Sequence, residues 1–391
     1  MATRHTVTLA LGDPPVELTA WDEIAITHDL RAPASGFALT VWREPDGERW
    51  NSVLESARLY APLTLTVDGA VQLRGSIERM RPGGNRSGAP LTLGGRGLAG
   101  AAMTAHVDPA LSLRGVSLAD ALTRIFRPLG IPVTVGVAAS DARAVQAGAR
   151  PGPVRQGTHR LHHRVDRYRP RPGTTVWQAA DTLCRRHGYL LYAAPTAAGL
   201  GLVVDRPAYD APVERSLTRT KVRRDNGGVL AWEGNILEGF RDVNATEVPT
   251  EVTVFGHSGL DAPQDARHRG RVSNDVLMAH PLVASSFFER PHYLRDPRAR
   301  TPQVAEQRAR RELARAMEEF DVYEATVQGF SQDGHLWAIN ATVHIDDELA
   351  GVRGDWLTTR VTFTRSRAGG HVTRLRLVPR GSLVIEPDPE V

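Results

Sequence analysis

Between Gly329 and Leu383 the sequence alternates apolar and polar residues in short runs that are separated by glycine or aspartate. The clearest runs cover residues 356–365 and 372–378, with two glycines between them. Successive side chains of a strand point to opposite faces, so this pattern predicts antiparallel strands joined by tight turns. We expect two sets of side chains on opposite faces of one hairpin: Val361, Phe363, Leu375 and Leu377 on one, Arg360, Thr362, Arg374 and Arg376 on the other.

Residues 1–100 show the same alternation in several short segments, with turn signals between them. The clearest hairpin covers residues 67–71, where Asp68-Gly69 forms the tip; this pair is typical of a turn of the primed type. Many short strands at such spacing predict a barrel or a sandwich.

The period changes to that of helices between residues 110 and 190. Ser117 to Asp120 forms a capping-box pattern before a helical stripe of Leu118, Leu122, Ile125 and Phe126. A second helix begins at Thr175, with Gln178 completing its capping box and Gly188 ending it. Its apolar face contains Cys184, the single cysteine, which we interpret as a packed thiol. Residues 131–135 are predicted as a short strand, and residues 189–192 and 200–204 as a hairpin, so this part of the chain is predicted to form a small α/β module.

Residues 143–172 combine many arginines and prolines with almost no apolar periodicity. This composition predicts a flexible or extended loop, because it cannot bury enough surface to offset the entropy of ordering. We expect its arginines to bind a partner, either an acidic face of a neighbouring protein, which we favour, or DNA phosphates in a channel: Arg143, Arg150, Arg155, Arg160, Arg164, Arg167, Arg169 and Arg171.

The next part of the chain returns to strands. We expect strands within 211–290, of which 252–256 is the clearest, a long irregular excursion over 258–300, and a helix over 302–320. Thr301-Pro302 is a typical start for that helix.

In its order of segments the chain resembles the baseplate hub proteins of Mu-like contractile phage tails, which also occur in contractile injection particles. The resemblance rests on an Arg- and Ala-rich helix followed by an ordered set of motifs: Gly329-Phe330, Gly334, Leu336-Trp337, Asn340, a strand with Val343, Ile345 and Asp346, and a hairpin with Gly369-Gly370. A strand-turn-strand passage from Leu65 to Ile77 and a strand ending at Gly256 also match.

The resemblance implies a mainly β fold with two tube-like β-barrels and the α/β insertion. It divides the chain into a first barrel (1–105), the inserted domain (106–210), crossing strands that complete the first barrel (211–244), a second barrel with the helix (245–385), and a tail (386–391). The two barrels would have similar topology and arise by internal duplication.

The resemblance also implies a function. Such a chain would be a structural hub that forms a homotrimer and joins the hexameric tail tube to the trimeric central spike. It would contact other baseplate proteins and, transiently, DNA in the channel. We expect it in the tail baseplate of a virion or phage-like particle, assembled in the bacterial cytoplasm. The sequence does not distinguish a phage, a defective prophage and an injection system.

Motifs for chemistry do not form a site that we would assign. Gly95, Gly97 and Gly100 match a dinucleotide-binding spacing, but Val107-Asp108-Pro109 follows too soon for the helix such a site needs. His159, His162 and His163 lie in the Arg- and Pro-rich stretch without a supporting shell, and the acidic run 346–348 lies at a strand end. We expect no catalytic residue, no metal, no cofactor and no hydrolytic activity.

Composition leaves two alternatives to the structural hub. One is a tail-associated cell-wall hydrolase, against which the missing acid/base constellation argues. The other is a nucleic-acid-binding module, which rests on a count of 48 basic residues of which only Lys221 is a lysine; 44 acidic residues give a net charge of only +4. No run of 18 apolar residues and no signal-peptide core occurs, so we expect neither a membrane span nor Sec export.

Overall fold

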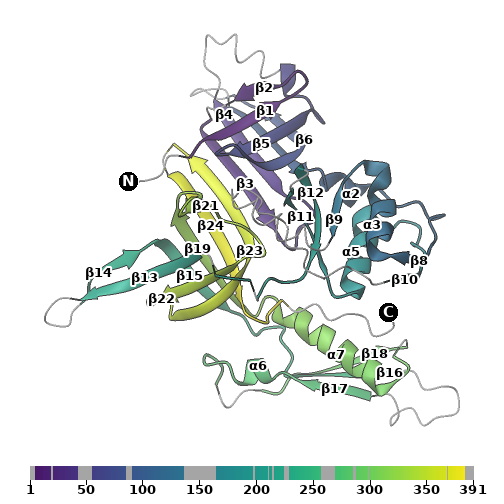
Figure 1. Cartoon of the computed structure of the whole chain (residues 1–391). Helices are drawn as coiled ribbons and strands as arrows, with labels where there is room; N and C mark the ends of the chain where they lie inside the picture. The colour runs from purple at the N-terminus through teal and green to yellow at the C-terminus, as the bar shows by residue number, and fades with distance from the viewer. Residues whose placement is uncertain are drawn as a thin grey trace.

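The computed structural model describes residues 5–18, 21–42, 55–84, 90–135, 164–196, 199–209, 211–213, 215–223, 229–256, 269–284, 288–297, 299–367 and 369–383. Within these residues the molecule is mainly β with an α/β insertion, as predicted (Figure 1). Fourteen strands form one continuous sheet that is divided into two curved halves.

The first half contains the first seven strands, taken from one uninterrupted stretch of chain. Their order in the sheet is β2-β1-β5-β6-β7-β4-β3, and all neighbours are antiparallel. Their bounds are β1 (Val7–Leu11), β2 (Val16–Leu18), β3 (Glu23–Asp29), β4 (Gly36–Trp42), β5 (Pro62–Val67), β6 (Ala70–Pro82) and β7 (Pro90–Gly97). At the predicted tip between β5 and β6, Asp68 and Gly69 have φ of 50° and 79°, as a primed turn requires.

The second half draws its strands from two distant parts of the chain. Their order is β14-β13-β22-β23-β24-β19-β15, and all neighbours are antiparallel except the parallel pair β13 and β22. The bounds are β13 (Arg215–Arg223), β14 (Val229–Gly234), β15 (Ile236–Val243), β19 (Asp321–Gln328), β22 (Thr342–Asp347), β23 (Val352–Ser366) and β24 (Gly370–Pro379). Val361, Phe363, Leu375 and Leu377 are buried on one face, as predicted.

The two halves share one strand order. When the strands of each half are numbered along the chain, both orders read 2-1-5-6-7-4-3. The match covers five antiparallel strands without exception, and it differs only in the direction of the edge hairpin. This order supports the predicted internal duplication.

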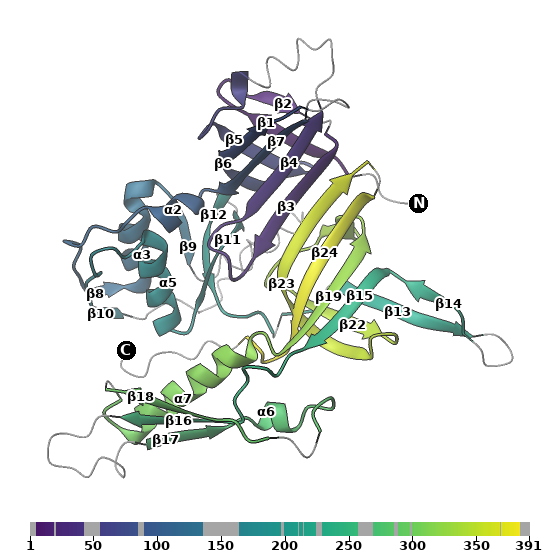
Figure 2. The same cartoon turned by 180° about the vertical axis from the view of Figure 1, so that it is seen from behind.

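Strand β23 joins the halves. Its first part, Val352–Leu357, pairs with β22, and its last part, Arg360–Ser366, pairs along the same edge with β3 (Figure 2). Apolar side chains from both halves belong to one core cluster, which includes Leu9, Ile26, Phe363 and Leu377. Because β23 contributes to both ladders, the halves are continuous in hydrogen bonding as well as in packing.

The inserted α/β unit packs against the first half through a hairpin. It comprises α2 (Gly100–Thr104), β8 (Leu113–Ser117), α3 (Leu118–Phe126), η1 (Arg127–Leu129), β9 (Val133–Val135), β10 (Arg164–Tyr168), α5 (Val176–Arg186), β11 (Leu190–Thr196) and β12 (Gly199–Asp205). Leu190 and Tyr192 of β11 enter the core of the large sheet, whereas Leu191 between them enters the core around the helices. Successive side chains of β11 therefore point to opposite faces and pack into two different cores.

A third unit separates β15 from β19 in the chain. It contains β16 (Glu251–Gly256), β17 (Arg269–Ser273), α6 (Asp275–Met278), β18 (Pro291–Asp296) and α7 (Pro302–Met317). Helix α7 covers β16 and β17 and has its own small core with Val252, Val254 and Ala305. Gly270 allows this close packing, because a Cβ there would lie 2.0 Å from the Glu306 nitrogen.

Several predictions about the division of the chain need correction. Strands within 211–244 do not complete the first half, because β13 pairs with β22 and β15 with β19. The stretch 251–317 forms the third unit rather than part of the second half, and 258–300 is not one irregular excursion, because it holds β17, α6 and β18. The helix ends at Met317, not at 320, since Phe320 turns into a core with Val248 and Leu277. The predicted tail lies outside the described residues.

Candidate assembly surfaces

The two halves share a local backbone geometry. In the first half it lies at the start of β5. Tyr60 has a positive φ of 64° and donates its N–H to the Ile77 carbonyl at 2.7 Å. Ile77 in turn donates to the Ala61 carbonyl at 3.2 Å. Directly after this point, the register of β6 with β7 shifts between Ile77 and Arg79, which marks a bulge.

The second half has the same arrangement at the start of β22. Asn340 has a positive φ of 53° and donates to the Thr358 carbonyl at 2.9 Å, and Thr358 donates to the Ala341 carbonyl at 2.9 Å. The register of β23 with β24 then shifts between Thr358 and Arg360. Ile77 and Thr358 are therefore equivalent positions, and β6 corresponds to β23.

Beyond the bulge of β23, strand β3 supplies the neighbour. The Leu30 N–H donates to the Thr359 carbonyl at 2.9 Å, and the ladder continues with Asp29 opposite Arg360. The Arg360 Nε atom lies 2.6 Å from a carboxylate oxygen of Asp29. A charge-assisted pair therefore fixes the register at the point where the halves meet.

A histidine near the chain start also ties the halves together. The His5 Nε2 atom accepts the Phe330 N–H at 2.9 Å, so the proton lies on Nδ1, which is 2.6 Å from an oxygen of Asp68. The ring stacks on Phe330 with centroids 5.0 Å apart. His5 is 3% exposed, so the contact is part of the core rather than a surface clasp.

A buried polar network organises the base of the second half. Arg219 on β13 donates to both oxygens of Asp347 on β22, at 2.9 and 2.6 Å, and Tyr323 on β19 donates to one of them at 2.5 Å. Burial opposes ionisation of Asp347, but the hydrogen bonds from Arg219 and Tyr323 outweigh it and hold its pKa below the usual value. Burial and the hydrogen bond to Asp347 raise the pKa of Tyr323.

Each residue of the acidic run that resembles a cation site in sequence has its own contact within the chain. Asp346 pairs with Arg353 at 3.0 Å, Asp347 with Arg219, and Glu348 accepts the backbone N–H of Lys221 at 3.1 Å. Across the described residues no group of three or more His, Cys, Asp or Glu side chains could hold a metal ion. His159, His162 and His163 lie outside these residues.

Two further features considered for chemistry, the single cysteine and the glycine-rich motif, are accounted for by packing. Cys184 is fully buried on α5, and burial raises the pKa of its thiol well above the usual value, so it is the packed thiol that the sequence predicts. The match to a dinucleotide motif ends in the five-residue helix α2. A Cβ at Gly95 would lie 2.0 Å from the Ser76 oxygen, so this glycine serves the close approach of β6 and β7.

The predicted arginine-rich loop is described only in its last part. Arg143, Arg150, Arg155 and Arg160 lie outside the described residues. The prediction of a loop is wrong for residues 164–168, which form β10 and pair with β8, because Val165 and Tyr168 enter the core of the insert. The four remaining arginines are exposed: Arg164, Arg167, Arg169 and Arg171. Arg164 donates to the Gly115 carbonyl at 3.0 Å, and Arg169 donates to the Pro109 carbonyl at 3.4 Å.

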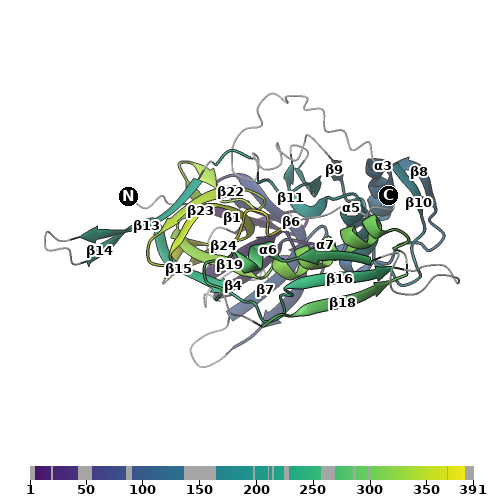
Figure 3. The same cartoon turned by 90° about the horizontal axis from the view of Figure 1, so that it is seen from below.

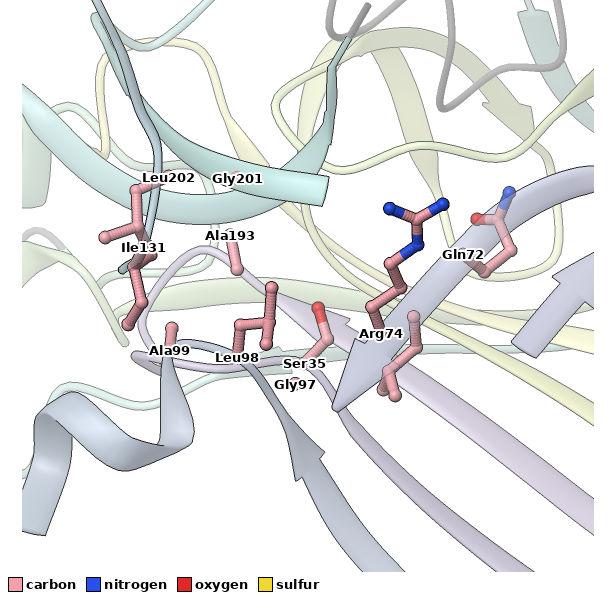
Figure 4. A pocket seen from close by; sticks show the side chains of 11 residues that line it. Ser35, Gln72, Arg74, Gly97, Leu98, Ala99, Ile131, Ala193, Gly201 and Leu202 are labelled. Atoms are coloured by element: carbon pink, nitrogen blue, oxygen red, sulfur yellow. The ribbon is translucent and has the colours of Figure 1, made fainter. Parts of the chain in front are cut away.

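A small cavity lies where the insert meets the first half. It is lined by Ser35, Gln72, Leu73, Arg74, Gly97, Leu98, Ala99, Ile131, Ala193, Gly201 and Leu202 (Figure 4). Its volume of about 20 Å³ is enough for a water molecule and too small for a substrate. Nearby His28 is buried, and desolvation lowers its pKa to about 4 although a hydrogen bond with Gln72 works in the opposite direction.

Free strand edges are the prominent surface feature. Of the described strands, β15 pairs only with β19, β14 only with β13, and β18 only with β16. The β13–β14 hairpin projects from the body (Figures 1 and 3), and Lys221 lies over the ring of Trp232 at 5.6 Å on it. On β15, Leu237 and Phe240 are 52% and 70% exposed. Unpaired edges with exposed apolar side chains are sites for pairing with another chain.

Solved structures with a similar fold include tail proteins. A tail protein from Neisseria meningitidis MC58 has a TM-score of 0.71 and 22% identity, and 99% of each chain is covered. The 43 kDa tail protein of prophage MuSo2 from Shewanella oneidensis has a TM-score of 0.72 and 17% identity, covering 97% of this chain and 99% of that one. This chain has the fold of phage tail proteins of the Mu-like type. The predicted resemblance is thus confirmed at the level of the fold.

A similar fold also occurs within a larger assembly. A chain in the Francisella PdpA–VgrG complex has a TM-score of 0.55 and 7% identity, with 96% of this chain and 58% of that chain covered. No protein-family model and no curated protein matches the sequence. No described helix is long and apolar enough to cross a membrane.

Sequence reasoning did not identify the residues that hold the second half together. Arg219 and Asp347 are 128 positions apart, and no local spacing links them. The only available signal was the acidic run at a strand end, which we interpreted as a turn. The sequence also did not indicate the free edge of β15. This edge is defined by the pairing of β15 with β19, and the third unit separates these two strands in the chain.

Proposed function

We propose that this chain is the structural hub of a contractile phage-like tail, where it joins the hexameric tail tube to the trimeric central spike. The observation that carries the proposal is the shared strand order of the two halves. Three copies of a chain with two equivalent halves present six similar sheets to a sixfold tube and keep threefold symmetry for a spike. The similar fold of the solved tail proteins supports the same conclusion.

In this proposal the chain acts as a homotrimer, at least in the particle, and its partners are the tube protein, the spike protein and neighbouring baseplate proteins. The free edges of β15, β14 and β18 are candidate contacts. The proposed location is the tail baseplate, after assembly in the bacterial cytoplasm.

Size-exclusion chromatography with light scattering tests this function, with the chain alone and with the spike protein of the same particle. We expect a complex of three hub chains and three spike chains, even where the hub alone is monomeric. A hub that forms hexamers, or that does not bind the spike in any ratio, contradicts the proposal.

We propose further that the hub carries no hydrolytic activity. A purified sample that turns over peptidoglycan, and loses this turnover on a single Asp, Glu or His substitution, would overturn the structural role in favour of a hydrolase.

The arginine-rich segment is proposed to bind an acidic face of a neighbouring tail protein, because guanidinium forks suit carboxylates. We expect a deletion of residues 145–162, which ends before β10 begins at Arg164, to leave the described fold intact. We expect weaker assembly of the particle and unchanged thermal unfolding. Normal assembly with loss of a salt-sensitive affinity for DNA would instead support the contact with DNA in the channel.

A further inference from the structure

The equivalence of the halves identifies an empty position on the first one. Within the chain, β3 occupies the edge of β23 from Arg360 to Ser366. Strand β6 is the counterpart of β23, and β5 with residues 60 and 61 occupies the same edge only as far as Ile77. Among the described strands none pairs with this edge of β6 beyond Ile77. The half-buried or exposed residues there are Glu78, Arg79, Met80, Arg81 and Pro82.

The equivalence also identifies a strand without its second neighbour. Strand β15 is the counterpart of β3, because each pairs with the same member of its own half, β19 and β4. Strand β3 uses its other edge to bind β23, whereas no described strand pairs with the other edge of β15. The exposed Phe240 lies on this strand.

We propose that the end of β15 and the two residues after it, residues 242–245 of one copy, pair with residues 78–81 of β6 in the next copy, in the way that β3 pairs with β23 inside the chain. This inference rests on the proposed trimer and names its contact. An interface that joins two different surfaces is head-to-tail, and such contacts close into a ring when the rotation allows it. The same junction would then occur six times in the ring, three times within chains and three times between them.

The pairings fix the register of this contact. Ile26 lies opposite Phe37, which lies opposite Gly95, the partner of Ile77. Along the same path in the second half, Arg241 lies opposite Tyr323, which lies opposite Leu377, the partner of Thr358.

Ile26 is therefore equivalent to Arg241. In the pairing of β3 with β23, Thr27 lies opposite Thr362 and His28 opposite Val361. When the same pairing is applied to the contact between copies, Asp242 of one copy lies opposite Arg81 of the next, and Val243 lies opposite Met80.

The side chains at this register suit each other. Arg81 and Asp242 are both exposed and carry opposite charges, and cross-strand pairs of opposite charge stabilise antiparallel ladders. Met80 and Val243 form an apolar pair on the other face. Pro82 has no N–H and limits the ladder to about four residues, against seven paired residues for β3 on β23. The contact between copies is therefore weaker than the one within a chain.

A pair of cysteines tests the register. In the variant Arg81→Cys/Asp242→Cys, the two Cα atoms of neighbouring copies would lie about 4.5–5.5 Å apart, which a disulfide spans. Cys184 does not compete, because it is fully buried. The matched control is Arg81→Cys/Glu238→Cys, whose second cysteine is also exposed on β15 but lies about 13 Å further along the strand.

After mild oxidation of each variant in complex with the spike protein of the same particle, we expect covalent dimers and closed trimers on a denaturing gel for the first variant, and at least tenfold fewer for the control. Equal cross-linking in both variants, or none in the first, overturns the inference. The hub proposal is judged separately, because binding of the spike by the wild-type chain is measured by light scattering. A complex of three hub chains and three spike chains without cross-links would support the hub proposal and contradict the register proposed for β15 and β6.

Discussion

The two halves of the large sheet reach the same strand order by different means. The first is made from one continuous stretch, residues 7–97, and its neighbours are antiparallel throughout. The second is interrupted by the unit of residues 251–317 and contains one parallel pair, β13 and β22. In the second half, Arg219 and Asp347 link that parallel pair through a buried ion pair, which the first half lacks among its described residues. The two halves therefore have the same strand order although their connections differ. In the second half a buried ion pair holds β13 against β22.

If β23 couples the halves, its side chains should matter to both. The ring centroid of Phe363 lies 5.2 Å from that of Phe330 and 6.1 Å from that of His28. We expect Phe363→Ala to lower the free energy of unfolding by about 3–5 kcal/mol, because it leaves a cavity in the shared core. Hydrogen exchange should then increase in strands of both halves. The control Leu65→Ala removes a buried side chain of the first half. If this control increased hydrogen exchange in β19 and β22 as much as Phe363→Ala does, the role of β23 in coupling the halves would be contradicted.

The polar anchor of the second half gives a sharper contrast. Asp347→Asn removes the charge that Arg219 needs in a buried site, and we expect a loss of about 3 kcal/mol. Asp346→Asn is the matched control, since Asp346 pairs with the exposed Arg353 and should change stability little. Urea unfolding of both variants measures the difference. Equal effects would show that the buried network is not what fixes β13.

The first half has its own buried titratable group, His28. Its pKa is lowered from 6.5 to about 4 in the folded chain, so the unfolded chain takes up the proton first as pH falls. His28 therefore does not lower the free energy of unfolding above pH 6.5. Between pH 6.5 and 4 it lowers this free energy progressively, by about 3 kcal/mol at most. His28→Gln should flatten the pH dependence of unfolding in this window. His335→Gln, at an exposed position, serves as the control; an unchanged slope for His28→Gln would be contrary to the account.

His5 makes the smallest of these links between the halves. His5→Phe keeps the stacking on Phe330 but leaves its N–H and the Asp68 carboxylate without their partner. We expect a loss of about 1–2 kcal/mol in thermal or urea unfolding. Because β23 still joins the halves, unfolding should remain a single transition; two separate transitions would show that His5, rather than β23, couples them.

Local patterns predict much of this fold. Alternation identified the faces of β23 and β24, Asp68-Gly69 identified a hairpin, and Thr175 with Gln178 identified the start of α5. These features depend on residues close in sequence. Membership of β13 and β15 in the second half depends on pairing with strands about a hundred positions away, so local periodicity assigned them to the wrong half. The candidate contact edges could not be predicted for the same reason, since an edge is defined by the neighbour it lacks.

The most direct test of the account is a reconstruction of a particle that contains this chain, at a resolution that separates strands. We predict three copies in one ring between tube and spike, with the junction of β3 and β23 alternating with a junction of β15 and the next copy's β6. Six copies or a single copy in the ring, or three copies whose β15 edges face away from β6, would contradict it.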